Sequence, residues 1–180
     1  MKGMVFTEFL DLVERTWSPA MVDQLIDACD LPSGAAYTAV GTYDHREMVQ
    51  LVVKLASLTG KSADDVLHWF GSRLFGSLGK AFPAFVDGQP DAYSLLCGIE
   101  GVIHVEVRKL YPDAELPVFD VHRPEPDTLV LDYRSPRCMD ALAHGLIDAC
   151  VERFGGGIDV RREPLGARPS DGSRFTLVRR

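Results

Sequence analysis

The segment VFDVHRPEPDTLVLDY, residues 118–133, is where the hydrophobic pattern of the chain changes from a helical to a β period. Val118–His122 and Thr128–Tyr133 are short runs rich in β-branched and aromatic residues, and the turn-forming segment Arg123–Asp127 separates them. Pro136 ends the second run. The pattern therefore predicts an antiparallel hairpin.

The chain after this hairpin predicts a helix and then a second hairpin. The apolar positions of the helix recur at helical spacing: Met139, Leu142, Leu146 and Cys150. Gly155–Gly157 would end the helix, and Ile158–Arg162 and Arg174–Val178 are expected to be two further strands. The C-terminal order is therefore ββαββ, with an antiparallel sheet.

The chain before the first hairpin is predicted to be helical. Residues suited to helix N-termini recur along it: Ser18 before Pro19, Asp44 with Glu47, Ser62 with Asp65, and Asp91. The helix after Asp91 is expected to run without a break through His104 to Leu110, because apolar residues recur at helical spacing over that length. Helices followed by a sheet region indicate an α+β fold.

The composition is that of a globular protein with an acidic surface. The chain has 180 residues, 46% of them apolar and 25% charged, and a formal net charge of −7. This charge argues against a nucleic-acid partner, and no apolar run reaches the ~20 residues that cross a bilayer. No signal-peptide pattern is present, so the chain is expected to be cytoplasmic. The cysteines form no CxxC pair, which predicts reduced thiols: Cys29, Cys97, Cys138 and Cys150.

Two features of the sequence could carry chemistry. His104 stands in the apolar segment Gly98–Val107, where a histidine by itself is more often a core residue than a metal ligand. Tyr133, Ser135 and Arg137 alternate at the end of a strand, so an extended backbone would point all three to one face. Two hydroxyls and a guanidinium suit paired carboxylates, and the alternative is a polar strand edge.

In combination these features resemble the H-NOX family, the haem nitric oxide/oxygen-binding domains related to the sensor domain of soluble guanylate cyclase. The motifs that carry the resemblance span nearly the whole chain: Met1-Lys2-Gly3, Val102–Val107 around His104, Pro117, Tyr133-x-Ser135-x-Arg137 and Gly145-Leu146. The resemblance implies a single domain over residues 1–180. It would consist of a helical lobe (1–60) and an anchoring lobe with the sheet (61–180), with haem b between them.

The resemblance also implies a role for each matched residue. His104 would be the proximal ligand of the haem iron, and Pro117 would press on a pyrrole ring and hold the macrocycle out of plane. Tyr133, Ser135 and Arg137 would bind the two propionates. No metal other than the haem iron is expected, because the cysteine and histidine ligands of the C-terminal zinc site found in some relatives have no counterpart here.

The distal pocket of the family decides which gas is bound. Matching to the family pattern places six apolar residues over the open face of the iron: Val5, Phe9, Leu74, Leu78, Leu142 and Leu146. In relatives that hold oxygen, a tyrosine near the position of Leu142 donates a hydrogen bond to bound O₂, which carries partial negative charge. An apolar pocket therefore favours NO, and also CO, over oxygen. Four tyrosines elsewhere could still supply a donor: Tyr37, Tyr43, Tyr93 and Tyr111.

The resemblance thus implies a haem-based sensor of NO and not an enzyme. NO would break the bond between the iron and His104, and relaxation of the haem would shift the helical lobe. The chain is short, so its output is expected to pass to a separate partner, by family analogy a histidine kinase or a cyclic-di-GMP enzyme. Three alternatives stay open: an O₂-binding member of the family, a peroxidase-type haem enzyme, and a haem-free adaptor that binds a small hydrophobic ligand.

Overall fold

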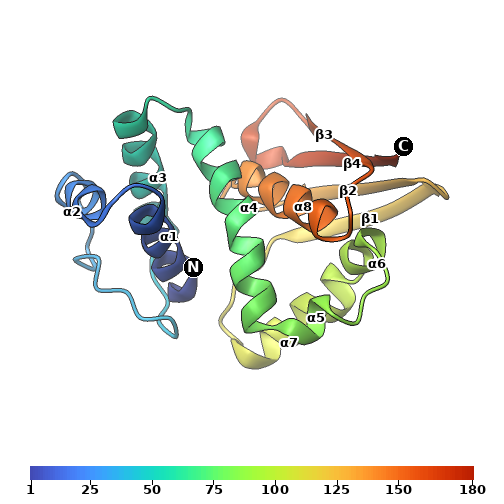
Figure 1. Ribbon diagram of the computed structural model, residues 1–180, viewed down its shortest axis with the longest axis horizontal. Helices are drawn as coiled ribbons and strands as arrows, with labels where there is room; N and C mark the ends of the chain where they lie inside the picture. Colours follow the sequence, from blue (N-terminus) through green and yellow to red (C-terminus); the bar gives the residue numbers. More distant parts are fainter.

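The computed structural model describes all 180 residues and has helices in its first part and a sheet in its second (Figure 1). The helical half comprises α1 (Gly3–Thr16), α2 (Pro19–Asp27), α3 (His45–Thr59), α4 (Ala63–Ala81) and α5 (Pro83–Val86). The sheet half comprises α6 (Ala92–Cys97), a π-helical turn (Ile99–Ile103), α7 (His104–Leu110), β1 (Val118–Glu125), β2 (Thr128–Arg134), α8 (Asp140–Arg153), β3 (Ile158–Pro164), a 3₁₀ turn (Pro169–Asp171) and β4 (Ser173–Arg179). This order confirms the α+β prediction. None of the helices has both the length and the hydropathy needed to span a bilayer.

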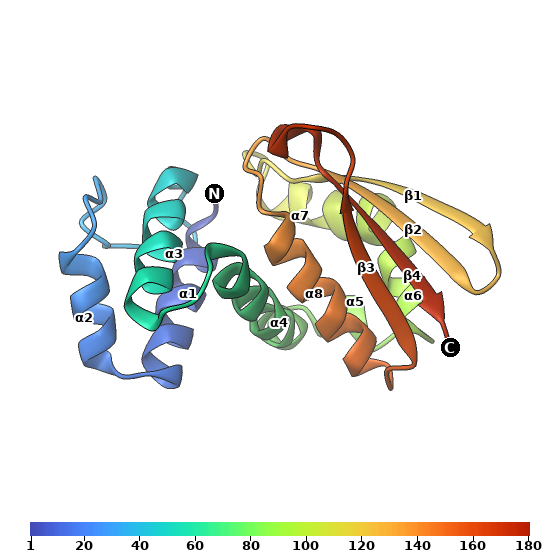
Figure 2. The same cartoon turned by 90° about the horizontal axis from the view of Figure 1, so that it is seen from above.

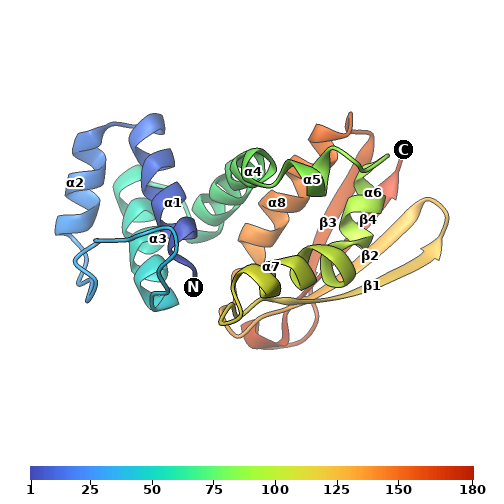
Figure 3. The same cartoon turned by 90° about the horizontal axis from the view of Figure 1, so that it is seen from below.

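The four strands form one antiparallel sheet in the order β1-β2-β4-β3, which confirms both predicted hairpins. Alternate residues of β2 and β4 are buried on one face, where Leu129 pairs with Leu177 and Leu131 pairs with Phe175. Helix α6, the π-helical turn and α8 pack against this face, whereas the opposite face is largely exposed (Figures 2 and 3). The sheet half therefore has a core of its own.

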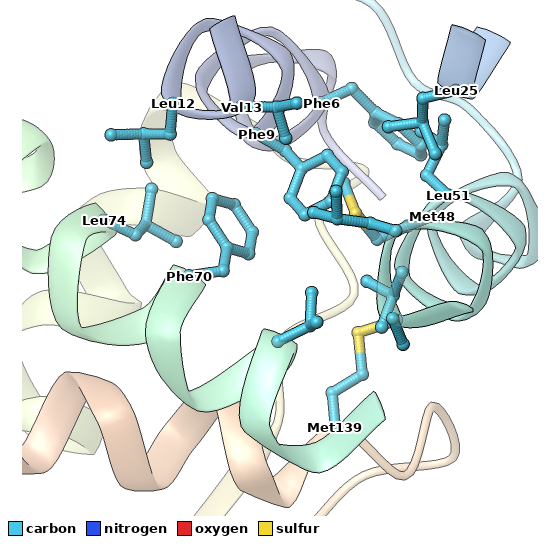
Figure 4. Close-up of a cluster of buried hydrophobic side chains, with 14 residues drawn as sticks. Phe6, Phe9, Leu12, Val13, Leu25, Met48, Leu51, Phe70, Leu74 and Met139 are labelled. Carbon is cyan, nitrogen blue, oxygen red and sulfur yellow. The ribbon is translucent and has the colours of Figure 1, made fainter. Parts of the chain in front are cut away.

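The helical half has a separate core, to which α1, α2, α3 and α4 contribute (Figure 4). Phe9 of α1 and Phe70 of α4 are fully buried in it, and their rings meet edge to face with centroids 5.0 Å apart. Met139, which precedes α8, also reaches this core. The sheet half thus contributes a side chain to the core of its neighbour.

Two glycines allow α4 and α8 to cross in direct backbone contact. A Cβ on Gly71 would lie 2.2 Å from the carbonyl oxygen of Leu142, and a Cβ on Gly145 would lie 2.1 Å from the carbonyl oxygen of His68. Both distances are far below van der Waals contact, so only glycine fits at either position. Helix α8 lies between α4 and the sheet, and the crossing therefore joins the two halves (Figure 2).

The structure confirms the predicted helix starts. Four side chains accept hydrogen bonds from N–H groups in the first turns of α2, α3, α4 and α6: Ser18, Asp44, Ser62 and Asp91. Asp44 caps α3 as expected, but Glu47 does not take part in the cap as its pairing with Asp44 in the sequence suggested. The Glu47 carboxylate is buried and accepts hydrogen bonds from the hydroxyls of Ser33 and Tyr37. Glu47 thus fixes the segment between α2 and α3 on the helix that follows it.

The long helix expected after Asp91 is broken into α6, a π-helical turn and α7. The N–H groups of Val102 and Ile103 both donate to the carbonyl oxygen of Gly98, at 2.9 and 3.1 Å, and the second bond has the i to i−5 spacing of a π-helix. Glycine has a low helix propensity, which makes position 98 a natural place for this break. The turn immediately precedes His104 and therefore sets the direction of its side chain.

Candidate functional site

His104 is the first residue of α7, and only 8% of its surface is exposed. Its Nδ1 lies 3.0 Å from Oε1 of Glu100, which assigns the donating N–H to Nδ1. The other ring nitrogen, Nε2, makes no hydrogen bond within the protein. An imidazole fixed through Nδ1 with Nε2 free has the arrangement of a histidine that ligates a metal through Nε2.

Glu100 is a residue of this site that the sequence analysis missed. The same oxygen that bonds His104 also accepts a hydrogen bond from the backbone N–H of Phe119 in β1, at 2.8 Å. Glu100 therefore holds the imidazole and the start of the sheet at the same time. Its position in the sequence could have identified it, because Glu100 lies four residues, or about one helical turn, before His104.

The surroundings of His104 favour its neutral form. Burial lowers the pKa of the imidazole below its ordinary value, and the Glu100 carboxylate opposes this by a smaller amount. Arg108, one turn further along α7, lowers the pKa of the imidazole as well. The ring is therefore neutral near pH 7, which is the form in which imidazole binds a metal.

Tyr133, Ser135 and Arg137 lie together on one side of the chain. Tyr133 and Ser135 are buried and the Arg137 side chain is 13% exposed, whereas the intervening Arg134 and Pro136 are exposed, as the alternation predicted. The strand itself ends at Arg134, and Ser135 Oγ accepts a hydrogen bond from the N–H of Arg137 in the turn that follows. Burial raises the pKa of Tyr133, so its hydroxyl stays protonated.

Pro117 is partly buried in the segment between α7 and β1. Nη2 of Arg137 donates to Oε2 of Glu115 at 2.8 Å, and Glu115 stands two residues before Pro117. The Glu115 side chain is 78% exposed, so breaking this ion pair costs little. The guanidinium already holds one carboxylate and could exchange it for that of a ligand.

The six residues expected over the open face of the iron all belong to the core of the helical half. They come from α1, α4 and α8 and are called the distal wall here: Val5, Phe9, Leu74, Leu78, Leu142 and Leu146. Phe9 and Leu74 are buried and lie in the same cluster (Figure 4). The other four pack against this cluster and are partly buried. None of these side chains can donate a hydrogen bond.

The tyrosines that could have supplied such a donor are engaged elsewhere. The hydroxyls of Tyr37, Tyr43 and Tyr93 each donate to an acceptor in another part of the protein, at 2.7, 3.2 and 2.8 Å. The ring of Tyr111 lies under the ammonium of Lys2, which is 5.0 Å from the ring centroid. The hydroxyls of Tyr37, Tyr43 and Tyr93 therefore already have acceptors, although Tyr37 and Tyr43 pack against the core that holds the distal wall.

Polar contacts near the N-terminus link the helical half to the end of α7. Nζ of Lys2 lies 3.4 Å from the carboxylate of Asp113, just after α7, and the Thr42 hydroxyl donates to the same carboxylate at 2.7 Å. The α-ammonium of Met1 donates to the carbonyl oxygen of Tyr43 at 2.7 Å. The contacts to Asp113 lie at the surface, where such bonds are individually weak.

The residues at this site fit a haem. A haem requires an axial ligand, partners for two propionates and apolar surroundings for its rings. The free Nε2 of His104 could serve as the axial ligand, and Tyr133, Ser135 and Arg137 offer donors for the two propionates. The residues of the distal wall would provide the apolar surroundings.

Comparison with known proteins points to the same chemistry. The sequence matches the Haem-NO-binding family over residues 2–162. A comparison with curated proteins gives no match.

Solved structures resemble this one over its full length. The H-NOX protein from K. algicida, unliganded and in the Fe(II) state, has 37% identity and a TM-score of 0.93, with 100% of this chain and 97% of that chain covered. The S. oneidensis H-NOX protein in the Fe(II)NO state has 27% identity and a TM-score of 0.90, with 100% and 99% covered. The Shewanella woodyi H-NOX in the Fe(II)CO state has 37% identity and a TM-score of 0.85, with 100% and 95% covered.

Proposed function

Because this chain belongs to the haem-NO-binding (H-NOX) family of gas-binding haem sensors, we propose that it is a sensor of nitric oxide that binds haem b through His104. The observation that carries the proposal is the buried imidazole of His104, whose Nδ1 is held by Glu100 and whose Nε2 is free. The ligation states of two relatives, with NO in one and CO in the other, support a diatomic gas as the ligand.

Each part of the site has its own task in this proposal. When bound, haem b supplies a ferrous iron with one open position for a diatomic gas. His104 would hold the iron through Nε2, and Pro117 would contact the macrocycle. Tyr133, Ser135 and Arg137 bind the two propionates through hydroxyl and guanidinium donors, because buried carboxylates need charge-assisted partners.

The distal wall selects the gas. Its aliphatic and phenyl side chains exclude water and offer no hydrogen-bond donor. Oxygen needs such a donor for stable binding, whereas NO and CO do not, so the pocket favours NO and CO over O₂. The wall also lacks the histidine or arginine that would cleave an O–O bond, which argues against a peroxidase.

Release of His104 is the signalling event that we propose. With the imidazole free, α7 is held by the Glu100 carboxylate and by the surface contacts of Asp113 with Lys2 and Thr42. Because those surface contacts are weak, the helical half can shift against the sheet half at small energetic cost. The signal would pass to a separate partner, by family analogy a histidine kinase or a cyclic-di-GMP enzyme.

An absorption spectrum of the haem-loaded protein tests the proposal. The reduced protein is expected to show a five-coordinate ferrous spectrum that is unchanged in air and becomes a five-coordinate nitrosyl spectrum when NO is added under nitrogen. A stable oxygen complex in air would instead support the O₂-binding alternative. Failure of the folded protein to take up haem would support the haem-free adaptor.

Leu142→Tyr is expected to give the protein measurable oxygen affinity. The phenol would place a donor in a wall that has none, and a hydrogen bond to a partly charged acceptor is worth about 1.5–3 kcal/mol, or roughly 10- to 100-fold in affinity. Oxygen dissociation kinetics of the reduced protein measure the gain. Leu142→Phe is the control, because it adds the ring without the hydroxyl, and an equal gain from both variants would contradict the assignment of this residue.

Glu100→Gln is expected to raise the reduction potential of the haem-loaded protein. The Glu100 carboxylate makes the His104 imidazole a stronger electron donor, which favours oxidised iron, and a neutral amide removes that charge. A spectroelectrochemical titration measures the potential, and the iron–histidine stretching frequency in the resonance Raman spectrum should fall. Glu106→Gln is the control, since Glu106 pairs with Lys109 at the surface. Equal shifts in both variants would contradict a specific role for Glu100.

A further inference from the structure

Two histidines and a carboxylate meet where α4 and α8 cross, apart from the residues around His104. Nε2 of His68 on α4 lies 2.7 Å from Oδ2 of Asp148 on α8, and Nε2 of His144 lies 3.7 Å from the same oxygen. All three ligand atoms lie within 4.8 Å of one another. Imidazole nitrogen and carboxylate oxygen are the ligands that zinc and neighbouring divalent ions prefer.

The spacing of these three atoms is close to that of a metal site. Tetrahedral zinc with ligands about 2.0–2.1 Å away has neighbouring ligand atoms about 3.3 Å apart. The two distances to Asp148, 2.7 and 3.7 Å, lie on either side of that value. The two imidazole nitrogens lie no more than 4.8 Å apart, so rotation of the imidazole rings can bring all three atoms to the spacing of one ion.

The backbone holds the three side chains in position. His144 and Asp148 are one helical turn apart on α8 and so lie on the same face of the helix. Across the crossing, a Cβ on Gly145 would lie 2.1 Å from the carbonyl oxygen of His68, so the backbones carrying His68 and His144 are in direct contact. The backbones at His68 and Gly145 thus cannot move apart without separating the two helices, whose ribbons are drawn in Figure 2.

Solvent access and charge both suit a cation. The side chains of His68, His144 and Asp148 are 40%, 24% and 32% exposed, which leaves room for water as a fourth ligand. Arg162, the cation on this side, is paired with Asp64 at 2.6 Å and approaches Asp140 at 3.5 Å. Its charge is therefore balanced by carboxylates other than Asp148.

We propose that His68, His144 and Asp148 form a Zn²⁺ site, completed by water, that clamps α4 to α8. This contradicts the expectation from the sequence that no metal other than the haem iron binds. That expectation considered only the cysteine and histidine ligands of a site near the C-terminus. The ligands proposed here are far apart in the sequence, since His68 and Asp148 are separated by 80 positions. The same two helices carry four residues of the distal wall: Leu74, Leu78, Leu142 and Leu146. Zinc at this site would therefore hold together the wall that faces the gas.

Equilibrium dialysis of the full chain against ZnCl₂, after treatment with EDTA, tests the site. Zinc and iron are measured together by inductively coupled plasma mass spectrometry, so haem loading is known for each sample. The wild-type protein is expected to bind one zinc per chain, and Asp148→Asn and His68→Gln to lose about 100-fold or more in zinc affinity. Asp148→Asn keeps a hydrogen-bond partner for His68, so its loss of zinc would not reflect a lost structural contact.

His122→Gln is the matched control, because His122 also stands next to a carboxylate, with 3.3 Å between its Nε2 and Oδ2 of Asp120. It should bind zinc like the wild type. Zinc should also raise the melting temperature of the wild type but not that of Asp148→Asn. No stoichiometric zinc in the wild type, or equal affinity in the wild type and Asp148→Asn, would overturn the proposal.

Discussion

His104→Gly is expected to abolish the five-coordinate, histidine-ligated ferrous spectrum of the haem-loaded protein. His104 offers the only buried imidazole with Nδ1 held by a carboxylate and Nε2 free, and glycine removes the ring without adding a competing group. Because glycine also leaves a space the size of the lost imidazole, millimolar imidazole in the buffer should restore a spectrum close to that of the wild type. Absorption spectra of the reduced protein, with and without imidazole, measure both effects.

The control for this experiment is His122→Gln, an exposed histidine in β1 whose replacement should leave the spectrum unchanged. An unaltered five-coordinate spectrum in His104→Gly would contradict the ligand assignment. The same outcome would remove the main support for the proposed signal, because that signal depends on release of His104 from the iron.

Gly145→Ala is expected to destabilise the protein by about 3 kcal/mol, near the upper end of the usual cost of overpacking. The new Cβ would lie 2.1 Å from the carbonyl oxygen of His68, and a backbone atom cannot turn aside as a side chain can. The helices α4 and α8 would have to separate, which also disturbs both cores. For a chain of this size the melting temperature should fall by roughly 6–12 °C, as measured by circular dichroism.

Gly76→Ala is the matched control on α4. A Cβ at Gly76 would meet no atom within 4 Å, so the substitution should leave stability unchanged or raise it by up to about 1 kcal/mol through better helix propensity. A fall in melting temperature of similar size in both variants would show that the close crossing at Gly145 is not the cause.

Features set by local interactions could be predicted from the sequence. Ser62 begins a helix because its hydroxyl accepts a hydrogen bond from the N–H of Asp65, three residues later. The β-branched residues around Val130 favour a strand. The alternate burial of Tyr133, Ser135 and Arg137 follows from the geometry of an extended chain. These outcomes need no knowledge of the neighbouring elements.

Features set by distant contacts could not be predicted in the same way. Glu47 resembles a capping residue, yet the hydroxyls of Ser33 and Tyr37 bind its carboxylate in the interior. The cluster of His68 with Asp148 exists only because α4 and α8 cross where they do. Whether a side chain binds a neighbour in sequence or a distant group depends on how the elements pack together. The sequence alone does not show that packing.

Residues near His104 form an intermediate case. Glu100 stands at a spacing that was visible in the sequence, but its bond to the N–H of Phe119 depends on the approach of β1 to the π-helical turn. An unbroken helix was the natural expectation there, since the apolar pattern continues across Gly98. The π-helical turn is favoured over a continuous α-helix by a small difference in free energy, and the spacing of apolar residues does not reveal this difference.

The π-helical turn at Ile99–Ile103 restricts how the length of the chain can change during evolution. Each residue of an α-helix turns the chain by about 100°, so the deletion of one residue here would restore a regular helix and rotate His104 away from its present direction. Insertion of one residue would rotate it the other way. The loop before α6 can gain or lose residues without such an effect, whereas the count of residues between α6 and His104 is fixed to a single position.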